Sequence, residues 1–206
     1  SNRATGVTFV DGVTRQTKIV RGKAVILCAQ ALESTRILLN SSTRNHSTGL
    51  GNSSGLLGRG LMDHSTGGGA SGVLPQFKNA PDPYSGPHRA NGIYVIRYRN
   101  TAKGPQQPNF IRGYGFQGGA GASFEVGASG YGIGYKKAVQ EGIYRISLGA
   151  FGESLARKDN FVSIDPKLKD AWGIPALHIS MTHGENEKLL QVDSAPTAAE
   201  ILLSAA

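Results

Sequence analysis

The chain has 206 residues, of which 29 are glycine and 17% are charged, and its net charge is +8. This length allows one sizeable hydrophobic core or two small ones, and the glycine content, about twice the usual share, indicates many turns. No apolar run approaches the roughly 20 residues of a membrane-spanning helix, and the first ten residues, SNRATGVTFV, contain no signal-peptide core. Because the chain begins within a strand pattern without methionine, we expect it to be an excerpt from a longer protein.

The first predicted element is a β-hairpin. Residues Thr5–Val10 and Thr14–Val20 are rich in β-branched side chains, and Asp11-Gly12 lies between them. Asp-Gly between two such runs is a strong signal for an antiparallel hairpin.

A strand, a tight turn and a helix are predicted next, between Lys23 and Ser42. Val25–Leu27 is an apolar run of the kind found in strands that are covered on both faces, and Cys28 at its end is expected to be an inert core thiol. The following residues have the 3.6-residue period of an amphipathic helix, with one face made of Leu32, Thr35, Leu38 and Leu39. In open α/β sheets ligands bind beyond the carboxyl ends of the strands, so a cofactor could approach the turn at Cys28–Ala31.

The second half of the chain predicts an antiparallel sheet. Short strand patterns at Gly92–Tyr98, Gly142–Gly149 and Asn160–Ile164 are separated by glycine and proline clusters, and Pro75–Pro87 is expected to be a surface excursion. Residues His183–Ala206 read as two helical stretches, with Pro196 near the start of the second.

Two glycine motifs resemble the dinucleotide-binding fingerprint but do not fulfil it. Gly113–Gly118 has the spacing GxGxxG, yet three more small residues follow where a helix should begin, so a loop or bulged strand is predicted. Gly49–Gly55 is one residue too long and precedes no long helix. The fingerprint itself is therefore absent from this chain.

Metal and nucleic-acid sites are not expected. The single cysteine excludes an internal disulfide and a multi-thiolate zinc site, and no two of the five histidines have HxxxH spacing. Adjacent residues of an extended chain point in opposite directions, so Asp63 and His64 are interpreted as structural. Arginines and aromatics alternate in Arg97–Gly115, but the positive charges are spread along the whole chain, which argues against a nucleic-acid interface.

Two linked motifs carry a resemblance to a known family. Residues 29–41 read AQALESTRILLNS and residues 51–64 read GNSSGLLGRGLMDH, and both are similar to motifs of the glucose-methanol-choline oxidoreductase family. Residues Asn109–Gly119 and Asp165–Lys188 resemble the same family, so the resemblance covers most of the chain.

The resemblance implies an α/β (α+β) fold, with residues 1–64 as the C-terminal part of an FAD-binding Rossmann-like domain. Residues 65–206 would be an incomplete substrate-binding domain built on an antiparallel sheet with helices. The whole protein would oxidise the CH-OH group of a small alcohol, sugar or polyol by hydride transfer to FAD.

The resemblance also places the flavin-contacting turn at Ala29, Gln30 and Ala31, where Gln30 departs from the usual glycine. The family's catalytic histidine lies beyond the equivalent of Ala206, so no catalytic residue is assigned and the isolated chain is expected to be inactive. Two alternatives remain open: a cofactor-free binding or structural domain derived from this fold, and a basic nucleic-acid-binding module.

Overall fold

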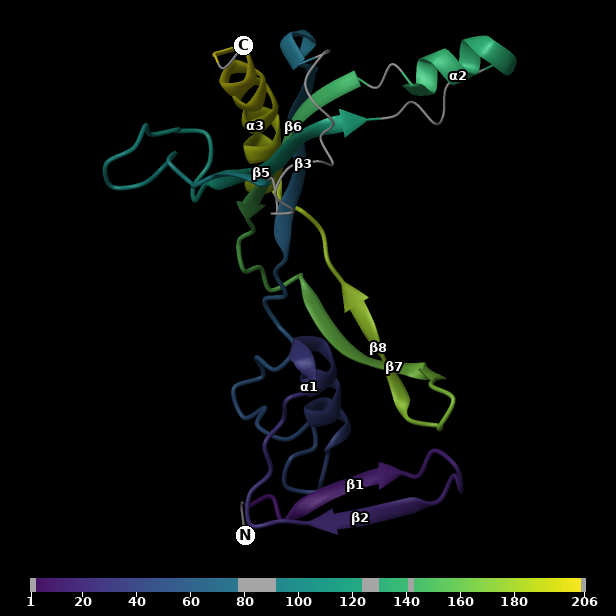
Figure 1. Ribbon diagram of the computed structural model, residues 1–206. Helices are drawn as coiled ribbons and strands as arrows, with labels where there is room; N and C mark the ends of the chain where they lie inside the picture. Colours follow the sequence, from purple (N-terminus) through teal and green to yellow (C-terminus); the bar gives the residue numbers. More distant parts are fainter. Residues whose placement is uncertain (1–2, 78–91, 124–129, 141–142, 205–206) are drawn as a thin grey trace. The chain divides into compact units, whose positions relative to one another are not determined.

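The computed structural model describes residues 3–77, 92–123, 130–140 and 143–204. The chain divides into two compact units (Figure 1). Unit 1 comprises residues Ser1–Met62 and Ala156–Thr182, and unit 2 comprises Asp63–Leu155 and His183–Ala206. All strand pairs in the described residues are antiparallel and helices accompany them, which confirms the α+β class. In the same residues no helix has the length and apolar character needed to cross a bilayer.

Unit 1 begins with the predicted hairpin. Strands β1 (Gly6–Val10) and β2 (Thr17–Arg21) pair from Gly6↔Arg21 to Val10↔Thr17. The turn is longer than two residues because Asp11 organises it: its carboxylate accepts the backbone N–H groups of Val13 (3.0 Å) and Thr14 (2.8 Å). A contact with Lys18 Nζ at 2.6 Å is the main reason that the pKa of Asp11 falls to about 2, and the backbone N–H donors lower it further.

The helix predicted after the hairpin is present as α1 (Gln30–Asn40). Its apolar face is half-buried as expected, but Arg36, which the period places outside that face, is also half-buried. The guanidinium of Arg36 donates to Asp170 Oδ2 (2.8 Å) and to the backbone oxygen of Pro175 (2.8 Å). Helix α1 is therefore fixed to the end of a second hairpin by a charge-assisted hydrogen bond, which also lowers the pKa of Asp170.

That second hairpin consists of β7 (Phe161–Lys169) and β8 (Pro175–Ser180). The strand predicted at Asn160–Ile164 is thus confirmed and runs five residues further. The loop of the second family-like motif attaches to it, since Gly58 accepts a backbone hydrogen bond from Val162 at 2.8 Å. Contacts of this kind group residues 156–182 with residues 1–62, whereas the sequence assigned residues 65–206 to one continuous domain.

Unit 2 is built on a four-stranded sheet in the order β3-β6-β5-β4. Its strands are β3 (His64–Val73), β4 (Gly92–Val95), β5 (Tyr114–Ser123) and β6 (Ile143–Glu153). A short 3-10 turn η1 (Pro75–Phe77) follows β3, and α2 (Gly132–Gln140) lies between β5 and β6 in sequence. Most of the predicted excursion at Pro75–Pro87 falls outside the described residues. Tyr114–Gly118 of the GxGxxG motif lie in β5, directly after Gly113, and pair with β6 without a register shift, so a regular strand stands where a loop or bulged strand was predicted.

Helix α3 (Glu185–Ser204) packs against one face of this sheet and closes the core of unit 2. Leu190 of α3 and Phe116 of β5 are both fully buried in that core. The remaining buried members of the cluster are Phe110, Tyr114, Leu148, Ala150 and Ala198. Two helical stretches were predicted here, but α3 is one helix of 20 residues that continues through Pro196.

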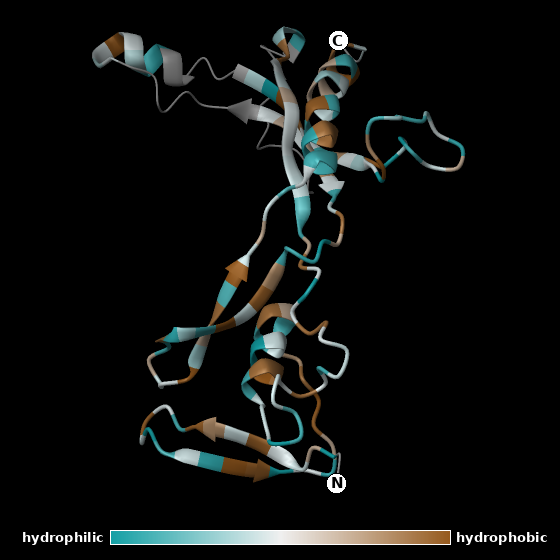
Figure 2. Ribbon diagram, turned by 180° about the vertical axis from the view of Figure 1, so that it is seen from behind, coloured by the Kyte–Doolittle hydropathy of each residue, from teal (hydrophilic) through white to brown (hydrophobic). Residues whose placement is uncertain are grey.

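Glycine allows α3 to approach the sheet closely. A Cβ atom at Gly68 of β3 would lie 1.6 Å from Ser194 Oγ and 2.9 Å from the backbone oxygen of Gln191. At Gly152 of β6 it would lie 2.5 Å from Leu190 Cδ2. Strand β3 is nearly white in Figure 2 because glycine, serine and alanine make up most of it.

A polar network also joins α3 to the sheet. Tyr114 donates its hydroxyl to Asp193, and Arg99 donates to Tyr114 Oη (2.8 Å) and to Thr197 Oγ1 (2.7 Å). Burial, together with the neighbouring Asp193 carboxylate, raises the pKa of Tyr114 to about 12. The phenol therefore stays protonated at neutral pH and acts as a donor that positions α3.

Candidate functional site

The turn predicted to contact a cofactor lies at the N-terminal end of α1. Ala29 is the residue that precedes the helix, with φ −93° and ψ 28°, and Gln30 and Ala31 are the first two helical residues. Ala29 is half-buried, and the other two residues are exposed. The three residues are adjacent on an accessible turn.

Gln30 adopts a backbone conformation that favours glycine. Its φ is +66°, in the left-handed region that side chains with a Cβ atom rarely occupy. This geometry explains physically why the family pattern has glycine at this position. Glutamine fulfils the same backbone role at an energetic cost.

The first turn of α1 offers unused hydrogen-bond donors. Ala29, the N-cap residue, has no polar side chain that could cap the helix, and no side-chain hydrogen bond caps this end of α1. The first backbone N–H groups of a helix have no partner within the helix, and the helix dipole favours negative charge there. Small side chains at Ala29 and Ala31 leave these donors open to an electron-rich group, a feature that suits a flavin.

The strand expected before this turn is not paired. Residues 24–28 are extended, but no strand pairs with them in the described part of the chain. Cys28 is exposed, so the prediction of a buried core thiol is wrong for this structure. The reason is that a three-residue apolar run is covered only where neighbouring strands flank it.

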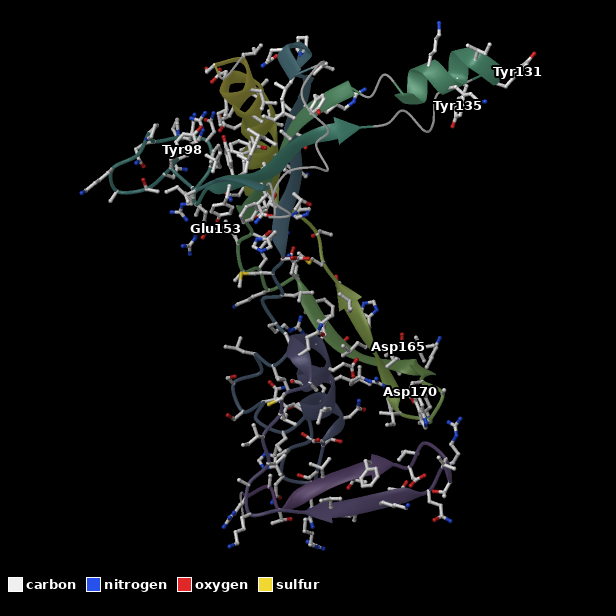
Figure 3. All side chains as sticks on the ribbon, in the orientation of Figure 1. Tyr98, Tyr131, Tyr135, Glu153, Asp165 and Asp170 are labelled. Atoms are coloured by element: carbon white, nitrogen blue, oxygen red, sulfur yellow. The ribbon has the colours of Figure 1, made fainter. Side chains whose placement is uncertain are left out.

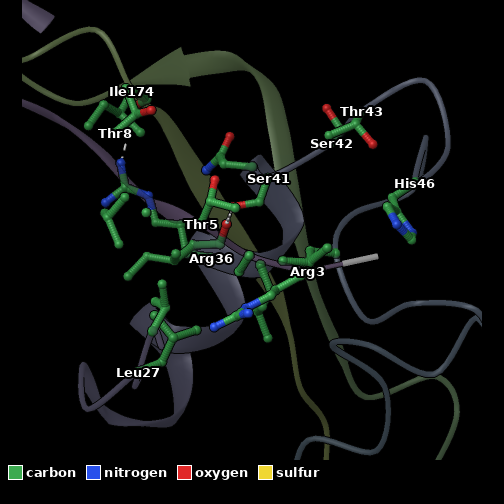
Figure 4. A pocket seen from close by; sticks show the side chains of 18 of the residues that line it. Arg3, Thr5, Thr8, Leu27, Arg36, Ser41, Ser42, Thr43, His46 and Ile174 are labelled. Atoms are coloured by element: carbon green, nitrogen blue, oxygen red, sulfur yellow. Dashed lines mark hydrogen bonds between the residues drawn. The ribbon is translucent and has the colours of Figure 1, made fainter. Parts of the chain in front are cut away.

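Unit 1 contains a cavity of about 670 Å³ beside this extended segment (Figure 4). Its walls come from β1, from Val25 and Leu27, from α1 and from the loop that follows α1. Figure 4 shows Arg3 and Arg36 near a group of hydroxyl side chains, but the guanidinium of Arg36 already donates to Asp170. Ala29, Gln30 and Ala31 do not line this cavity, so the predicted cofactor turn and the cavity are separate features.

The histidines do not form a catalytic or metal-binding group in the described residues. His64 packs edge-on against Phe151, with ring centroids 5.4 Å apart, and its backbone N–H donates to Asp63 Oδ1 at 2.7 Å. Both contacts agree with a structural role of the Asp63-His64 pair, which stays a prediction. His88 falls outside the described residues, and in the described part no three His, Cys, Asp or Glu side chains could hold a metal ion.

The arginine- and aromatic-rich stretch Arg97–Gly115 makes specific contacts within unit 2. Arg97 forms an ion pair with Glu153 of β6, which is labelled in Figure 3, and Arg99 pairs with Asp193 at 3.0 Å. Both guanidinium groups therefore serve the fold. The stretch that suggested a nucleic-acid interface forms the loop between β4 and β5 and the first two residues of β5.

Replacing Gln30 with glycine should stabilise the protein by about 0.5–1 kcal/mol. Glycine removes the cost of a left-handed residue, and its larger entropy in the unfolded chain offsets part of that gain. Denaturant unfolding of the variant would measure the change. Gln16→Gly is the control, because Gln16 has no positive φ and should gain nothing; equal effects of both changes would contradict the strain at Gln30.

Comparison with known proteins agrees with the motifs. Residues 1–66 match the sequence profile of the GMC oxidoreductase family. The chain is 29% identical, over 91% of its own length, to a 2-methyl-1,2-propanediol dehydrogenase from Mycolicibacterium austroafricanum. It is 24% identical, over 89% of its length, to the fructose dehydrogenase large subunit of Gluconobacter japonicus.

The aligned regions cover 34% and 33% of those two proteins, so the chain spans about a third of the length of its relatives. The profile match covers the hairpin, α1 and the loop that follows it, and the two relatives extend the similarity through unit 2. Together these matches show that most of the chain is similar to the GMC oxidoreductase family.

Proposed function

We propose that the chain is an internal part of an FAD-dependent oxidoreductase that oxidises the CH-OH group of an alcohol, sugar or polyol. The family supports an oxidoreductase, and the names of the two relatives indicate dehydrogenases of a diol and of a sugar. The bound flavin would supply the acceptor for the hydride.

The observation that carries this proposal is the uncapped turn at Ala29, Gln30 and Ala31. Its backbone donors are free of side-chain caps, its alanines leave room, and the left-handed Gln30 orients the first helical turn. These residues fit a flavin because ring and phosphate oxygens accept hydrogen bonds from such N–H groups. In this proposal the three residues bind and orient the cofactor, and the substrate's proton goes to a base outside the chain.

We also propose that unit 2 supplies the substrate contacts. The resemblance assigns this role to residues 65–206, which include most of unit 2. Helix α3 covers one face of its sheet, and the opposite face carries exposed Tyr94 together with Phe151, at a centroid distance of 6.0 Å. Gly115 of β5 pairs with Phe151, and a Cβ at Gly115 would lie 2.8 Å from the backbone oxygen of Val95, so glycine allows the chain after β4 to approach β5 closely here. Aromatic rings beside polar groups such as Gln117 suit a hydroxylated substrate.

Blocking the turn should abolish flavin binding without unfolding the protein. Ala31 is exposed, so Ala31→Phe adds bulk that the described fold tolerates but that a flavin approaching the N–H groups would meet. We expect at least a tenfold loss of bound flavin per protein in the full-length enzyme, measured from its absorbance spectrum.

Ala171→Phe is the matched control, because Ala171 is exposed in the turn between β7 and β8 and is far from α1's first turn in sequence. This variant should keep its flavin. Full flavin content in Ala31→Phe would refute the assignment of the turn, and a colourless wild-type enzyme after reconstitution would favour a cofactor-free domain.

A further inference from the structure

Helix α2 has little support from the rest of the described residues. It comprises nine residues, Gly132–Gln140, and makes no extensive contact with another helix or strand of the described chain. Isolated helices shorter than about 12 residues are only marginally stable in water. We therefore expect α2 to be stabilised by a surface that it contacts.

Two large apolar side chains at the start of α2 are exposed. Tyr131, directly before the helix, is 96% exposed, and Ile133 in its first turn is 75% exposed. Figure 3 shows Tyr131 at the end of α2. Single exposed apolar side chains are common, but two of them within three residues on an unpacked helix form a small apolar surface.

The same segment is positively charged. Lys136 and Lys137 of α2 are both exposed, and neither forms an ion pair in the part of the chain that the structure describes. The sequence has no Asp or Glu from Val126 to Gln140. Since the whole chain carries a net charge of +8, no acidic excess elsewhere compensates these cations. The segment therefore favours an anionic partner.

We propose that Tyr131 and α2 bind an anionic phospholipid surface. In this arrangement Tyr131 and Ile133 enter the headgroup region. The ammonium groups of Lys136 and Lys137 contact the lipid phosphates. Tyrosine is enriched where a membrane meets water, because its ring is apolar and its hydroxyl is polar. Lysine covers apolar surface with its stem while its ammonium stays in water, and each lysine near an anionic surface strengthens binding about fivefold.

A protein segment fits this combination of side chains less well. Lysine is depleted in protein interfaces, because a buried ammonium requires a paired carboxylate. The relatives are about three times as long as the region aligned to this chain, so further polypeptide is a second possible cover. Such a cover would have to place a carboxylate at each of two lysines. A lipid surface supplies phosphates for both without a specific geometry.

Co-sedimentation of the full-length protein with lipid vesicles tests the proposal. Vesicles of phosphatidylcholine with about one third phosphatidylglycerol should bind the protein about tenfold more tightly than vesicles of phosphatidylcholine alone. Wild-type protein that does not bind the anionic vesicles would overturn the proposal.

The apolar contact is tested with a pair of double variants. Tyr131→Ser combined with Ile133→Ser should weaken binding to the anionic vesicles about tenfold, because both side chains lose their transfer into the headgroup region. Val192→Ser combined with Leu203→Ser is the control, since these side chains of α3 are 72% and 76% exposed. This control should bind as wild type does, and equal weakening of both double variants would contradict a contact through α2.

The charged contact is tested in the same way. Lys136→Gln combined with Lys137→Gln should remove most of the preference for anionic vesicles. Lys103→Gln combined with Lys188→Gln makes the same change of net charge at two exposed lysines elsewhere in unit 2 and should keep the preference. Equal losses in the two double variants would indicate attraction by net charge alone and would contradict the assignment to α2.

Hydrogen exchange on the wild-type protein keeps the proposal testable if a variant fails to fold. Amides of residues 136–140 should exchange about tenfold more slowly with anionic vesicles than without them, because the lipid contact stabilises the helix. Slow exchange of these amides without lipid would mean that polypeptide already covers α2, and the proposal would be wrong. Protection without lipid that grows with protein concentration would point to a second copy and would equally overturn it.

None of these readouts uses flavin, so the lipid contact is independent of the proposed function. A flavoenzyme that does not bind anionic vesicles would refute the lipid contact alone. A protein that binds the vesicles through α2 but takes up no flavin would refute the flavoenzyme alone.

Discussion

Replacing Gly68 with alanine should lower the free energy of unfolding by about 3 kcal/mol, at the upper end for overpacked cores. The new Cβ would lie 1.6 Å from Ser194 Oγ and 2.9 Å from the backbone oxygen of Gln191. A rotation of the serine side chain relieves the first contact, but the second requires the backbone of α3 to move away from β3. Urea denaturation of the variant would measure the loss.

Gly72→Ala is the matched control on the same strand. A Cβ there meets only Ile146 Cγ2 at 4.0 Å, so the change should be neutral within about 0.5 kcal/mol. Adding Ser194→Ala to Gly68→Ala should restore only part of the stability, because the contact with the Gln191 oxygen persists. Equal effects of the two glycine substitutions would contradict the close packing of α3 on β3.

The second large effect is expected at Glu187, whose side chain is buried in the first turn of α3. Its carboxylate accepts the backbone N–H groups of Leu155 (2.8 Å) and Gly184 (2.7 Å), so it caps α3 and holds the end of β6. Glu187→Ala leaves two donors without a partner and should cost about 3 kcal/mol of unfolding free energy. Glu187→Gln retains one acceptor oxygen and should cost about half as much.

Glu185→Gln is the control for Glu187, because Glu185 is exposed in the same turn and its nearest cation, Lys188, is 3.9 Å away. That variant should lose less than about 0.5 kcal/mol. Burial alone would raise the pKa of Glu187, but the backbone hydrogen bonds outweigh it and the pKa is lowered.

The lowered pKa gives this carboxylate a defined pH dependence. Its contribution to stability is complete above the pKa of a glutamate in the unfolded chain, about 4.3, and disappears as the pH falls through the lower pKa of the folded state. Wild type should therefore lose more stability than Glu187→Gln between about pH 5 and pH 3. Parallel pH profiles of the two proteins would contradict the role of Glu187.

Local signals predicted the elements whose patterns are independent of distant contacts. The Asp11-Gly12 hairpin, the helix beginning near Leu32 and the alternating strand β6 follow from the sequence because turn chemistry and apolar period determine them locally. Leu148 of β6 lies in the core, and Tyr144 and Ile146, which share its face of the strand, are half-buried.

Other elements depend on packing that the sequence does not display. Strand β3 has almost no β-branched residues, and its glycines are required by the approach of α3, which no local pattern reveals. Pro196 has no backbone N–H and therefore removes one hydrogen bond within α3. The packing of α3 against the sheet on both sides of Pro196 outweighs this loss, so one helix forms where two were predicted.

The position of the candidate site stays a prediction, and its backbone geometry could not be read from the sequence. The resemblance located the turn at Ala29, Gln30 and Ala31, and the unusual glutamine was visible in the sequence. Its left-handed φ depends on how the extended segment enters α1, and only the structure shows it. The sequence predicted a covered strand at Val25–Leu27, but no strand pairs with this run in the described residues. An apolar run has the same sequence whether or not neighbouring strands cover it.

The most direct test of the account is the visible absorbance spectrum of the full-length protein, recorded anaerobically before and after addition of small alcohols, polyols and sugars. The account predicts a flavin spectrum that at least one of these compounds bleaches, because a hydride moves from its CH-OH carbon to the flavin. A reconstituted protein that shows no flavin spectrum, or one whose flavin none of these donors reduces, would contradict it.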